Sequence, residues 1–510
     1  MRLDYLLKGQ QLLEQHGKAD IDITGLTADS RAVKKGSLFV AVKGSNEDGH
    51  RYLADAIRRG AHALLVEQGE KPFEGVTLIR VPDTRAALSE LASRFYHYPA
   101  HNLNLIGITG TNGKTTTSYL LEKILKEAGR EVGVIGTINY RFKGKSLGAS
   151  LTTPEITDLM SMIREMRDAD VTDIIVEVSS HSLDQGRTRG LKWSRAIFTS
   201  FSRDHLDYHS SMEEYFRAKS LLFDCLGESQ KGDEAQAIIN MDDPKGRILQ
   251  EITRVPVVSY GLGHGCMVSA AAIESTAGGL RFRLVTPSGV VPIISPLLGQ
   301  INVYNILGAA ATAFSYNTDL ETIARGIKRL SSVPGRLQRV ENKRGLSVFV
   351  DYAHSPDALE KLLQTVKHLA RGRLITVFGC GGDRDRGKRP EMGMIAGNYG
   401  DLVIVTSDNP RGEDPAAIVG EIEPGIRKSG LDKVNPDLPY GGRGYQIILD
   451  RRKAIRAAIQ LAHKEDIVVI AGKGHEDYQV IGKTRRHFSD VEEAALAANT
   501  INPINTMTGN

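Results

Sequence analysis

Short apolar runs alternate with helix-like stretches along most of the 510-residue chain. In residues 1 to about 97, runs such as "GSLFVAVKG" and "AHALLVEQG" are separated by Gly and Asp, and "YLADAIRRG" has a helical pattern. The first seventeen residues, "MRLDYLLKGQQLLEQHG", also have the pattern of an amphipathic helix. This part of the chain therefore predicts a small α/β domain.

A second unit opens with "NLNLIGITGTNGKTTTSYLLEKILKEAG", which reads as a strand, a glycine-rich turn and a helix. Further strands are predicted at "DIIVEVSS" and "RAIFTSF", with helical segments between them. The alternation predicts a parallel sheet wound by helices, continuing to about residue 335. The stretch from "RVPVVSYG" to "GVVPIISPL" predicts a small antiparallel addition.

A third unit follows, with strands at "LSVFVDYA", "RLITVFGC", "DLVIVTS" and "DIVVIAG" and helices between them. The predicted fold class is therefore α/β with three domains. They are a small N-terminal α/β domain (1–97), a central P-loop ATPase-like parallel sheet domain (98–335) and a C-terminal Rossmann-like domain (336–510). The tail "NTINPINTMTGN" is expected to be frayed.

Composition narrows the class of protein. Hydrophobic residues make up 41% and charged residues 25%, as in soluble globular proteins. The net charge of +4 disfavours a nucleic-acid surface, and three cysteines without CxxC spacing favour a reducing compartment. The stretch "SPLLGQINVYNILGAAATAF" carries Gln300, Asn302 and Asn305, which make it a poor membrane span. We expect a cytoplasmic protein that neither binds nucleic acid nor inserts in a membrane.

The strongest chemical signal is "GITGTNGKTTT". Gly110, Gly113, Lys114 and Thr115 follow a predicted strand and open a helix, so backbone N–H groups there can cradle phosphates. The usual P-loop has a glycine five residues before Gly113, but that position is Ile108, so the loop is a short variant. A plain strand-to-helix turn is the alternative. No guanine-reading Asn-Lys-x-Asp is present, so ATP is the expected nucleotide.

Several polar residues follow predicted strands. Glu177 ends the strand in "DIIVEVSS", and a cluster after "RAIFTSF" comprises Asp204, His205, Asp207 and His209. Carboxylates suit a phosphate-bound Mg²⁺. Taken singly, each acid reads equally well as solvated and each histidine as a turn residue, and Lys219 reads as a surface lysine.

Taken together, these segments identify a resemblance. The chain resembles the Mur ligases, ATP-dependent amide-forming enzymes of peptidoglycan precursor synthesis, from "LTADSR" to "GKGHEDYQ". The resemblance rests on "GTNGKTT", "LTTPE", "EVSSHSLDQGR", "SRDHLDYH", "RAKSLLF", "NVYN", "PGR", "DYAHSPDA", "GGDRDRGKRP", "DNPR" and "GKGHE". Within the family it is nearest to the ligases that add meso-diaminopimelate.

The resemblance implies that a substrate carboxylate is phosphorylated by ATP and the acyl phosphate is then attacked by an amine. It implies catalytic roles for Lys114, Glu177, His205 and Lys219. Mg²⁺ would be held by Thr115, Glu177, His205 and Lys219, the last as a carbamate formed with CO₂. The implied ATP contacts are Gly110, Thr111, Asn112, Gly113, Lys114, Thr115, Thr116, Asn305, Arg336 and Asp351.

The resemblance also implies two small-molecule substrates and a monomeric enzyme. A UDP-muramoyl dipeptide would contact Ser30, Ser45, Asn46, Glu47, Thr152, Thr153, Ser179, Gln185 and Arg187. Diaminopimelate would contact Arg384, Asp408, Asn409, Pro410, Arg411, Gly472 and Glu476. An arginine fork binds a carboxylate in bidentate fashion, so a site arranged around the distal carboxylate should reject lysine. The lysine-adding relatives lack Asn in this motif, so the resemblance implies that "DNPR" favours diaminopimelate.

Other functions stay open at this point. A lysine-adding or folylpolyglutamate-synthetase-like ligase would share fold and reaction type, and "DNPR" and the full first domain speak against both. A P-loop nucleotide switch would not need three domains. A nucleic-acid-dependent ATPase is disfavoured by the near-neutral charge.

Overall fold

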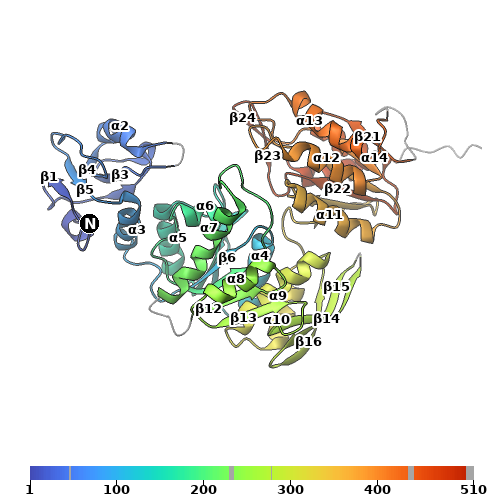
Figure 1. Ribbon diagram of the computed structural model, residues 1–510, viewed down its shortest axis with the longest axis horizontal. Coiled ribbons are helices and arrows are strands. Elements are labelled where there is room, and N and C mark those ends of the chain that lie inside the picture. The colour runs from blue at the N-terminus through green and yellow to red at the C-terminus, as the bar shows by residue number, and fades with distance from the viewer. Residues whose placement is uncertain (45–46, 229–234, 277, 435–441, 501–510) are drawn as a thin grey trace, which may run out of the picture.

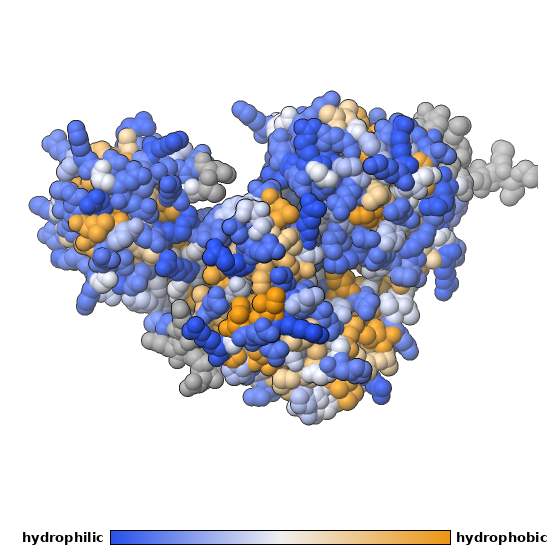
Figure 2. All heavy atoms as spheres, viewed as in Figure 1, coloured by the Kyte–Doolittle hydropathy of each residue, from blue (hydrophilic) through white to orange (hydrophobic). Residues whose placement is uncertain are grey.

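Three large β-sheets divide the described chain into three α/β bodies, and a small two-stranded sheet lies in the C-terminal one (Figure 1). The computed structural model describes residues 1–44, 47–228, 235–276, 278–434 and 442–500. The central body lies between the N-terminal and C-terminal bodies, and Figure 2 shows the surface hollowed between those two outer bodies. The three-domain α/β fold predicted from the sequence is confirmed, while Ser45, Asn46 and the tail 501–510 lie outside the described residues.

The N-terminal sheet has the order β1-β5-β4-β3-β2, with only β1 antiparallel to its neighbour. The helix predicted over residues 1–17 is wrong. The chain forms one helical turn, then leaves it at Gly9, whose φ is +81°, and enters a strand at Glu14. The elements are α1(Leu3–Leu6), β1(Glu14–His16), β2(Gly25–Thr27), η1(Ser30–Ala32), β3(Ser37–Val40), η2(Gly49–Tyr52), α2(Leu53–Arg58), β4(Ala61–Val66), β5(Thr77–Arg80) and α3(Thr84–Phe95).

The central sheet has eleven strands in the order β16-β15-β14-β13-β12-β11-β6-β10-β7-β8-β9. Its middle, from β14 to β7, is parallel, and antiparallel pairings extend it through β15 and β16 at one edge and through β8 and β9 at the other. The predicted antiparallel addition is therefore a continuation of this sheet, because β14 pairs with β13.

The strands of this domain are β6(Asn104–Thr109), β7(Val132–Ile135), β8(Asn139–Phe142), β9(Lys145–Gly148), β10(Asp173–Glu177), β11(Trp193–Phe198), β12(Gln236–Asn240), β13(Val257–Gly261), β14(Val268–Thr276), β15(Gly279–Thr286) and β16(Gly289–Ser295). The helices are α4(Lys114–Glu127), α5(Ile156–Asp168), α6(Ser180–Asp184), α7(Met212–Asp224), η3(Cys225–Glu228), α8(Pro244–Ile252), α9(Gln300–Phe314) and α10(Leu320–Lys328). Within the described residues, no helix combines the length and apolar character that crossing a bilayer requires.

The C-terminal sheet has the order β17-β18-β22-β19-β20-β21 and is parallel except for β17. Helices α11, α12 and α13 cover one face of this sheet, and α14 and α15 cover the other. A separate apolar core lies between the sheet and each of these two helix layers. In such a sheet, ligands bind beyond the carboxyl ends of the strands. The elements are β17(Gln338–Arg339), β18(Ser347–Asp351), α11(Pro356–Leu369), β19(Leu374–Phe378), α12(Lys388–Tyr399), β20(Leu402–Val405), α13(Pro415–Lys428), β21(Gly444–Ile447), α14(Arg451–Leu461), β22(Ile467–Ala471), β23(Tyr478–Ile481), β24(Thr484–His487) and α15(Asp490–Thr500).

Candidate functional site

The glycine-rich loop lies between β6 and α4, as its sequence predicts. Gly113 has φ +90° and Gly110 has φ +146°, conformations that L side chains rarely adopt. A Cβ on Gly113 would lie 2.4 Å from Asn305 Oδ1, and one on Gly110 would lie 2.0 Å from Thr199 Oγ1. Without side chains at these two glycines, the loop backbone packs against Thr199 and Asn305. The free N–H groups at the start of α4 can then bind an anion.

Two lysines meet at this loop. Lys114 Nζ donates to the carbonyl oxygens of Gly110 and Thr111, at 2.8 and 3.0 Å. Lys219 Nζ donates to the same Gly110 oxygen at 3.0 Å and lies 4.5 Å from the ring centroid of Tyr215. Lys219 is only 1% exposed, so its reading as a surface lysine is wrong. Burial, together with the charge of Lys114, lowers the pKa of the Lys219 amine well below its usual value.

Glu177 ends β10 beneath the loop and accepts hydroxyl hydrogen bonds. Thr115 Oγ1 and Thr137 Oγ1 each lie 2.8 Å from its Oε2, and Ser118 Oγ lies 3.4 Å from its Oε1. Thr137, at the end of β7, was not predicted from the sequence. The sequence feature that could have indicated it is a hydroxyl residue shortly after a buried strand.

The oxygens of Thr115 and Glu177 fit Mg²⁺, which is usually bound through one or two carboxylates, phosphate oxygens and water. Within the described ranges, no group of three or more His, Cys, Asp or Glu side chains is placed to hold a metal by itself. In the part of the chain that the structure describes, His205 makes no hydrogen bond to Thr115 or Glu177. The centroid of its ring lies 4.9 Å from that of His181, and its Nε2 lies 3.6 Å from Asp204 Oδ2.

A cavity of about 390 Å³ opens above the loop, between the central and C-terminal domains. Most of the expected ATP residues line it: Thr111, Asn112, Gly113, Lys114, Thr115, Thr116, Asn305, Arg336 and Asp351. Asp351 ends β18, and its carboxylate accepts from the backbone N–H groups of Leu337 and Ala353, at 2.6 and 2.8 Å. Burial raises the pKa of Asp351 against the opposing charge of Arg336.

A larger cavity of about 1920 Å³ lies between the first and central domains. Of the residues expected to bind the UDP-sugar substrate, it is lined by Ser30, Glu47, Gln185 and Arg187. Ser45 and Asn46 lie outside the described residues, and the remaining three, Thr152, Thr153 and Ser179, line the 390 Å³ cavity instead, together with Arg187. Arg187 connects the two groups, because it donates to Thr153 O at 3.1 Å and to Gln185 Oε1 at 2.6 Å.

The third cavity, of about 350 Å³, lies at the carboxyl ends of β18, β19, β20 and β22. Six of the seven residues expected to bind diaminopimelate line it: Arg384, Asp408, Asn409, Arg411, Gly472 and Glu476. Pro410 does not, which fits its role as a turn residue.

Lys473, which sequence reasoning missed, changes the charge of this third cavity. It is fully buried, and its Nζ lies 3.0 Å from Glu476 Oε2 and 3.1 Å from Asn409 Oδ1. Asn409 also donates to Glu476 Oε2 at 2.8 Å. Among the described residues, Asp408 Oδ1 is buried without a hydrogen-bond partner, with Lys473 Nζ 3.8 Å away, so it keeps the capacity to accept from a substrate ammonium.

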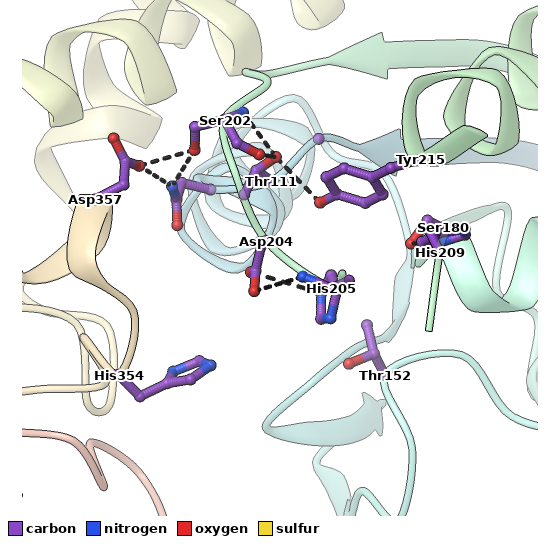
Figure 3. A network of polar contacts seen from close by, with 12 residues as sticks. Thr111, Thr152, Ser180, Ser202, Asp204, His205, His209, Tyr215, His354 and Asp357 are labelled. Atoms are coloured by element: carbon purple, nitrogen blue, oxygen red, sulfur yellow. Dashed lines mark hydrogen bonds and ion pairs between the residues drawn. The ribbon is translucent and has the colours of Figure 1, made fainter. Parts of the chain in front are cut away.

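The three cavities meet at one residue. His205 lines all of them, and Asp204 and His354 line both the 390 Å³ cavity expected to take ATP and the 350 Å³ cavity expected to take diaminopimelate, called below the ATP cavity and the amino-acid cavity (Figure 3). Burial lowers the pKa of His205 to about 4, although Asp204 opposes the shift. Three ligands, one per cavity, would present their reacting groups here.

A phosphate loop joined to a Rossmann-like domain, with a third domain walling a large polar cavity, defines an ATP-dependent ligase. Residues 108–313 match the Mur ligase middle domain, residues 335–474 the Mur ligase glutamate ligase domain and residues 22–96 the Mur ligase family catalytic domain. The chain belongs to the Mur ligase family.

Its relatives include curated proteins named UDP-N-acetylmuramoyl-L-alanyl-D-glutamate–2,6-diaminopimelate ligase. The one from Geobacter metallireducens is 47% identical over 501 residues, covering 98% of each chain. Those from Geobacillus thermodenitrificans and Clostridioides difficile are 43% and 41% identical, over 98% and 97% of this chain and 99% of theirs. A solved structure of the same name, 32% identical over 98% of both chains, superimposes with a TM-score of 0.68.

Proposed function

We propose that this protein is an ATP-dependent ligase that joins meso-diaminopimelate to the D-glutamate of UDP-N-acetylmuramoyl-L-alanyl-D-glutamate, in peptidoglycan precursor synthesis. The observation that carries the proposal is the convergence of three cavities, from three domains, at His205. The names and full-length similarity of the relatives support the choice of substrates.

The loop N–H groups and Lys114 would hold the ATP phosphates, and Arg336 would reach them from the C-terminal domain. Mg²⁺ on Thr115 and Glu177 would neutralise phosphate charge in the first step. Lys219 suits carbamate formation, because only a neutral amine attacks CO₂ and this amine is buried beside a second cation. The product is an anion whose oxygens attract Mg²⁺, whereas an ammonium repels it.

The muramoyl dipeptide would lie in the large cavity, with its glutamate reaching past Arg187 toward the ATP cavity. Thr152, Thr153 and Ser179 would meet this reacting end. Diaminopimelate would lie in the third cavity with its distal carboxylate on Arg411 and Arg384 and an ammonium at Asp408. We further infer that the enzyme acts in the cytoplasm as a monomer, which light scattering would test.

The decisive experiment measures phosphate release with ATP, Mg²⁺ and UDP-N-acetylmuramoyl-L-alanyl-D-glutamate, with meso-diaminopimelate, with L-lysine or with neither. Release that depends on diaminopimelate is the expected result. Equal release with lysine would keep the ligase but remove the specificity assigned to Arg411. No release with either acceptor would overturn the proposed function.

A further inference from the structure

His354 has no assigned role, yet it lies where the bond must form. It belongs to the loop between β18 and α11 and lines both the ATP cavity and the amino-acid cavity. Figure 3 shows its ring extending from the C-terminal domain toward Asp204 and His205 of the central domain. The side chain therefore faces the space between an activated carboxylate and an incoming amine.

The hydrogen bonding of His354 fixes the tautomer of the neutral ring. Its Nδ1 lies 2.8 Å from the carbonyl oxygen of Tyr352. A carbonyl only accepts, so Nδ1 carries the hydrogen and Nε2 bears the lone pair. In the part of the chain that the structure describes, Nε2 has no hydrogen-bond partner. The ring thus presents a free base to the cavity.

The loop that carries His354 is held in place across the domain boundary. Asp357, three residues on, accepts from Ser202 Oγ at 2.8 Å and from Asn112 Nδ2 at 3.1 Å, and both donors belong to the central domain (Figure 3). The Tyr352 ring packs edge-on against the His354 ring, with the two ring centroids 4.6 Å apart. These contacts fix the imidazole relative to the phosphate loop.

The surroundings keep the imidazole of His354 neutral. Burial lowers its pKa, and so do Lys388 at the start of α12 and Arg336 in the loop before β17. Asp204, after β11, and the Tyr352 carbonyl act in the opposite direction without reversing the shift. At neutral pH the ring is therefore ready to accept a proton.

We propose that Nε2 of His354 is the base that removes a proton from the attacking amine of the amino-acid substrate; this rests on the proposed function. Amines of this kind have pKa values of about 8–10 and arrive mostly protonated, whereas only the free amine attacks. By taking the ammonium proton, Nε2 supplies the free amine at a pH at which most of the substrate in solution is protonated.

The step balances as follows. Nε2 takes one proton from the bound ammonium, and the freed nitrogen lone pair forms the N–C bond while the carbonyl π pair moves to oxygen. The oxyanion then re-forms C=O, and the C–O bond to phosphorus breaks with its electron pair leaving on phosphate. One of the two remaining N–H protons passes to that phosphate and Nε2 releases its proton to water, so an ammonium and an acyl phosphate dianion give an amide, hydrogen phosphate and one proton.

Asp204 and His205 are poorer candidates for this base. Burial alone would raise the pKa of the Asp204 carboxyl, but the rings of His205 and His354 hold it below its usual value. Asp204 also accepts from the backbone N–H of His205 at 2.9 Å. Burial lowers the pKa of His205 to about 4, and His205 is the imidazole that the resemblance assigns to the metal.

The test compares two nucleophiles on the full-length enzyme with ATP, Mg²⁺ and the UDP-dipeptide. Hydroxylamine is largely unprotonated at neutral pH, so it traps an acyl phosphate without needing a base. In His354→Asn, the amide N–H₂ keeps the bond to Tyr352 O and the base is lost. We expect diaminopimelate-dependent kcat to fall by about 10²–10³-fold, while hydroxylamine-dependent phosphate release stays within about twofold of wild type.

The pH profile supplies a second readout. Above the pKa of His354 the wild-type rate should be level, whereas the His354→Asn rate should rise about tenfold per pH unit until the substrate amine is deprotonated. His354→Gln should behave like His354→Asn. His264→Asn, on an exposed loop after β13, is the matched control and should behave like wild type in both assays.

Equal loss of both reactions in His354→Asn would show that the residue positions ATP or the phosphate loop, and would overturn the proposal. Unchanged ligation of diaminopimelate would also overturn it. A wild-type enzyme that releases phosphate with neither nucleophile would instead refute the ligase function itself, so the two failures are distinguishable.

Discussion

Lys114 and Lys219 donate to the same acceptor, the carbonyl oxygen of Gly110, at 2.8 and 3.0 Å. Two ammonium groups held this closely repel each other, and burial removes the water that would screen them. The arrangement is stable when one of the two is neutral or has become an anion. Lys219, enclosed by α7 and the loop, is the one whose pKa is most strongly lowered by burial.

Lys219→Ala should therefore lower kcat by on the order of 100-fold, as the loss of a supporting group at a metal site does. Short carboxylic acids should restore part of the rate, because a carboxylate replaces the carbamate in the space left behind. ¹³C-bicarbonate should give a carbamate NMR signal in the wild type only. Lys145→Ala, which removes an exposed lysine paired with Glu165, is the control. Full activity of Lys219→Ala without added acid would contradict the carbamate.

Gly113→Ala should weaken ATP binding by about tenfold or more, which calorimetry would measure. The new Cβ meets Asn305 Oδ1 at 2.4 Å in a left-handed conformation that itself costs about 1–3 kcal/mol. Gly129→Ala separates the two effects, since its φ of +76° is similar and nothing lies within 4 Å of the added Cβ. Equal losses of ATP affinity in both variants would refute the steric explanation.

Arg411→Ala should lower kcat/KM for diaminopimelate by about 10–150-fold, because a hydrogen bond to a charged group contributes about 1.5–3 kcal/mol. Among the described residues, the Arg411 guanidinium makes one hydrogen bond, from Nη1 to Gly382 O at 2.8 Å, which leaves its other donors for a carboxylate. Weak activity with lysine should be unchanged. Arg443→Ala, an exposed arginine outside the cavity, is the comparison. A parallel loss with lysine would show that Arg411 does not read the distal carboxylate.

Asp490→Asn should destabilise the C-terminal domain by about 3–5 kcal/mol, because it leaves a buried charge unpaired. Arg451 and Asp490 are fully buried and joined by two bonds of 2.7 Å. Arg451 also donates to Ala471 O at 3.0 Å, just before Gly472 of the amino-acid cavity. Denaturant unfolding would measure the loss. Glu165→Gln, in the exposed pair with Lys145, should cost under about 1 kcal/mol.

Glu413→Gln should flatten the acid dependence of stability. The guanidinium of Arg389, aided by the Asp383 backbone N–H, lowers the pKa of Glu413 from 4.5 to about 2 in the folded protein. A group whose folded pKa is lowered stabilises the fold above its unfolded pKa and ceases to do so as pH falls through the folded one. The wild type should therefore lose more thermal stability than the variant between about pH 4.5 and 2. Glu321→Gln, at an exposed helix start, should match the wild type. Identical curves for Glu413→Gln and wild type would contradict the assignment.

Local patterns predicted the parts of the fold that local forces decide. The apolar run Leu402–Val405 is a strand, and the glycine pair before Lys114 opens a helix, because both need only chain geometry. The prediction of a seventeen-residue N-terminal helix was wrong because the chain turns at Gly9 and because Glu14–His16 pairs with β5 as a strand.

The site residues that were not predicted from the sequence are placed by tertiary contacts. Lys473 and Thr137 became site residues only through partners 64 and 40 positions away, Asn409 and Glu177. Similarly, Thr152, Thr153 and Ser179 face the ATP cavity because the chain folds them next to the end of β10. The periodicity of apolar residues along a sequence does not predict such long-range contacts.

The meeting of three cavities at His205 has a pharmacological consequence. A compound that enters any one cavity and extends to His205 would displace the reacting end of whichever substrate approaches from the other two. Because its binding would exclude all three substrates, the compound would compete with each of them, and kinetics against any one substrate would show competition. Such a compound would need only a small polar head at the junction and could draw its affinity from whichever cavity wall it fits best.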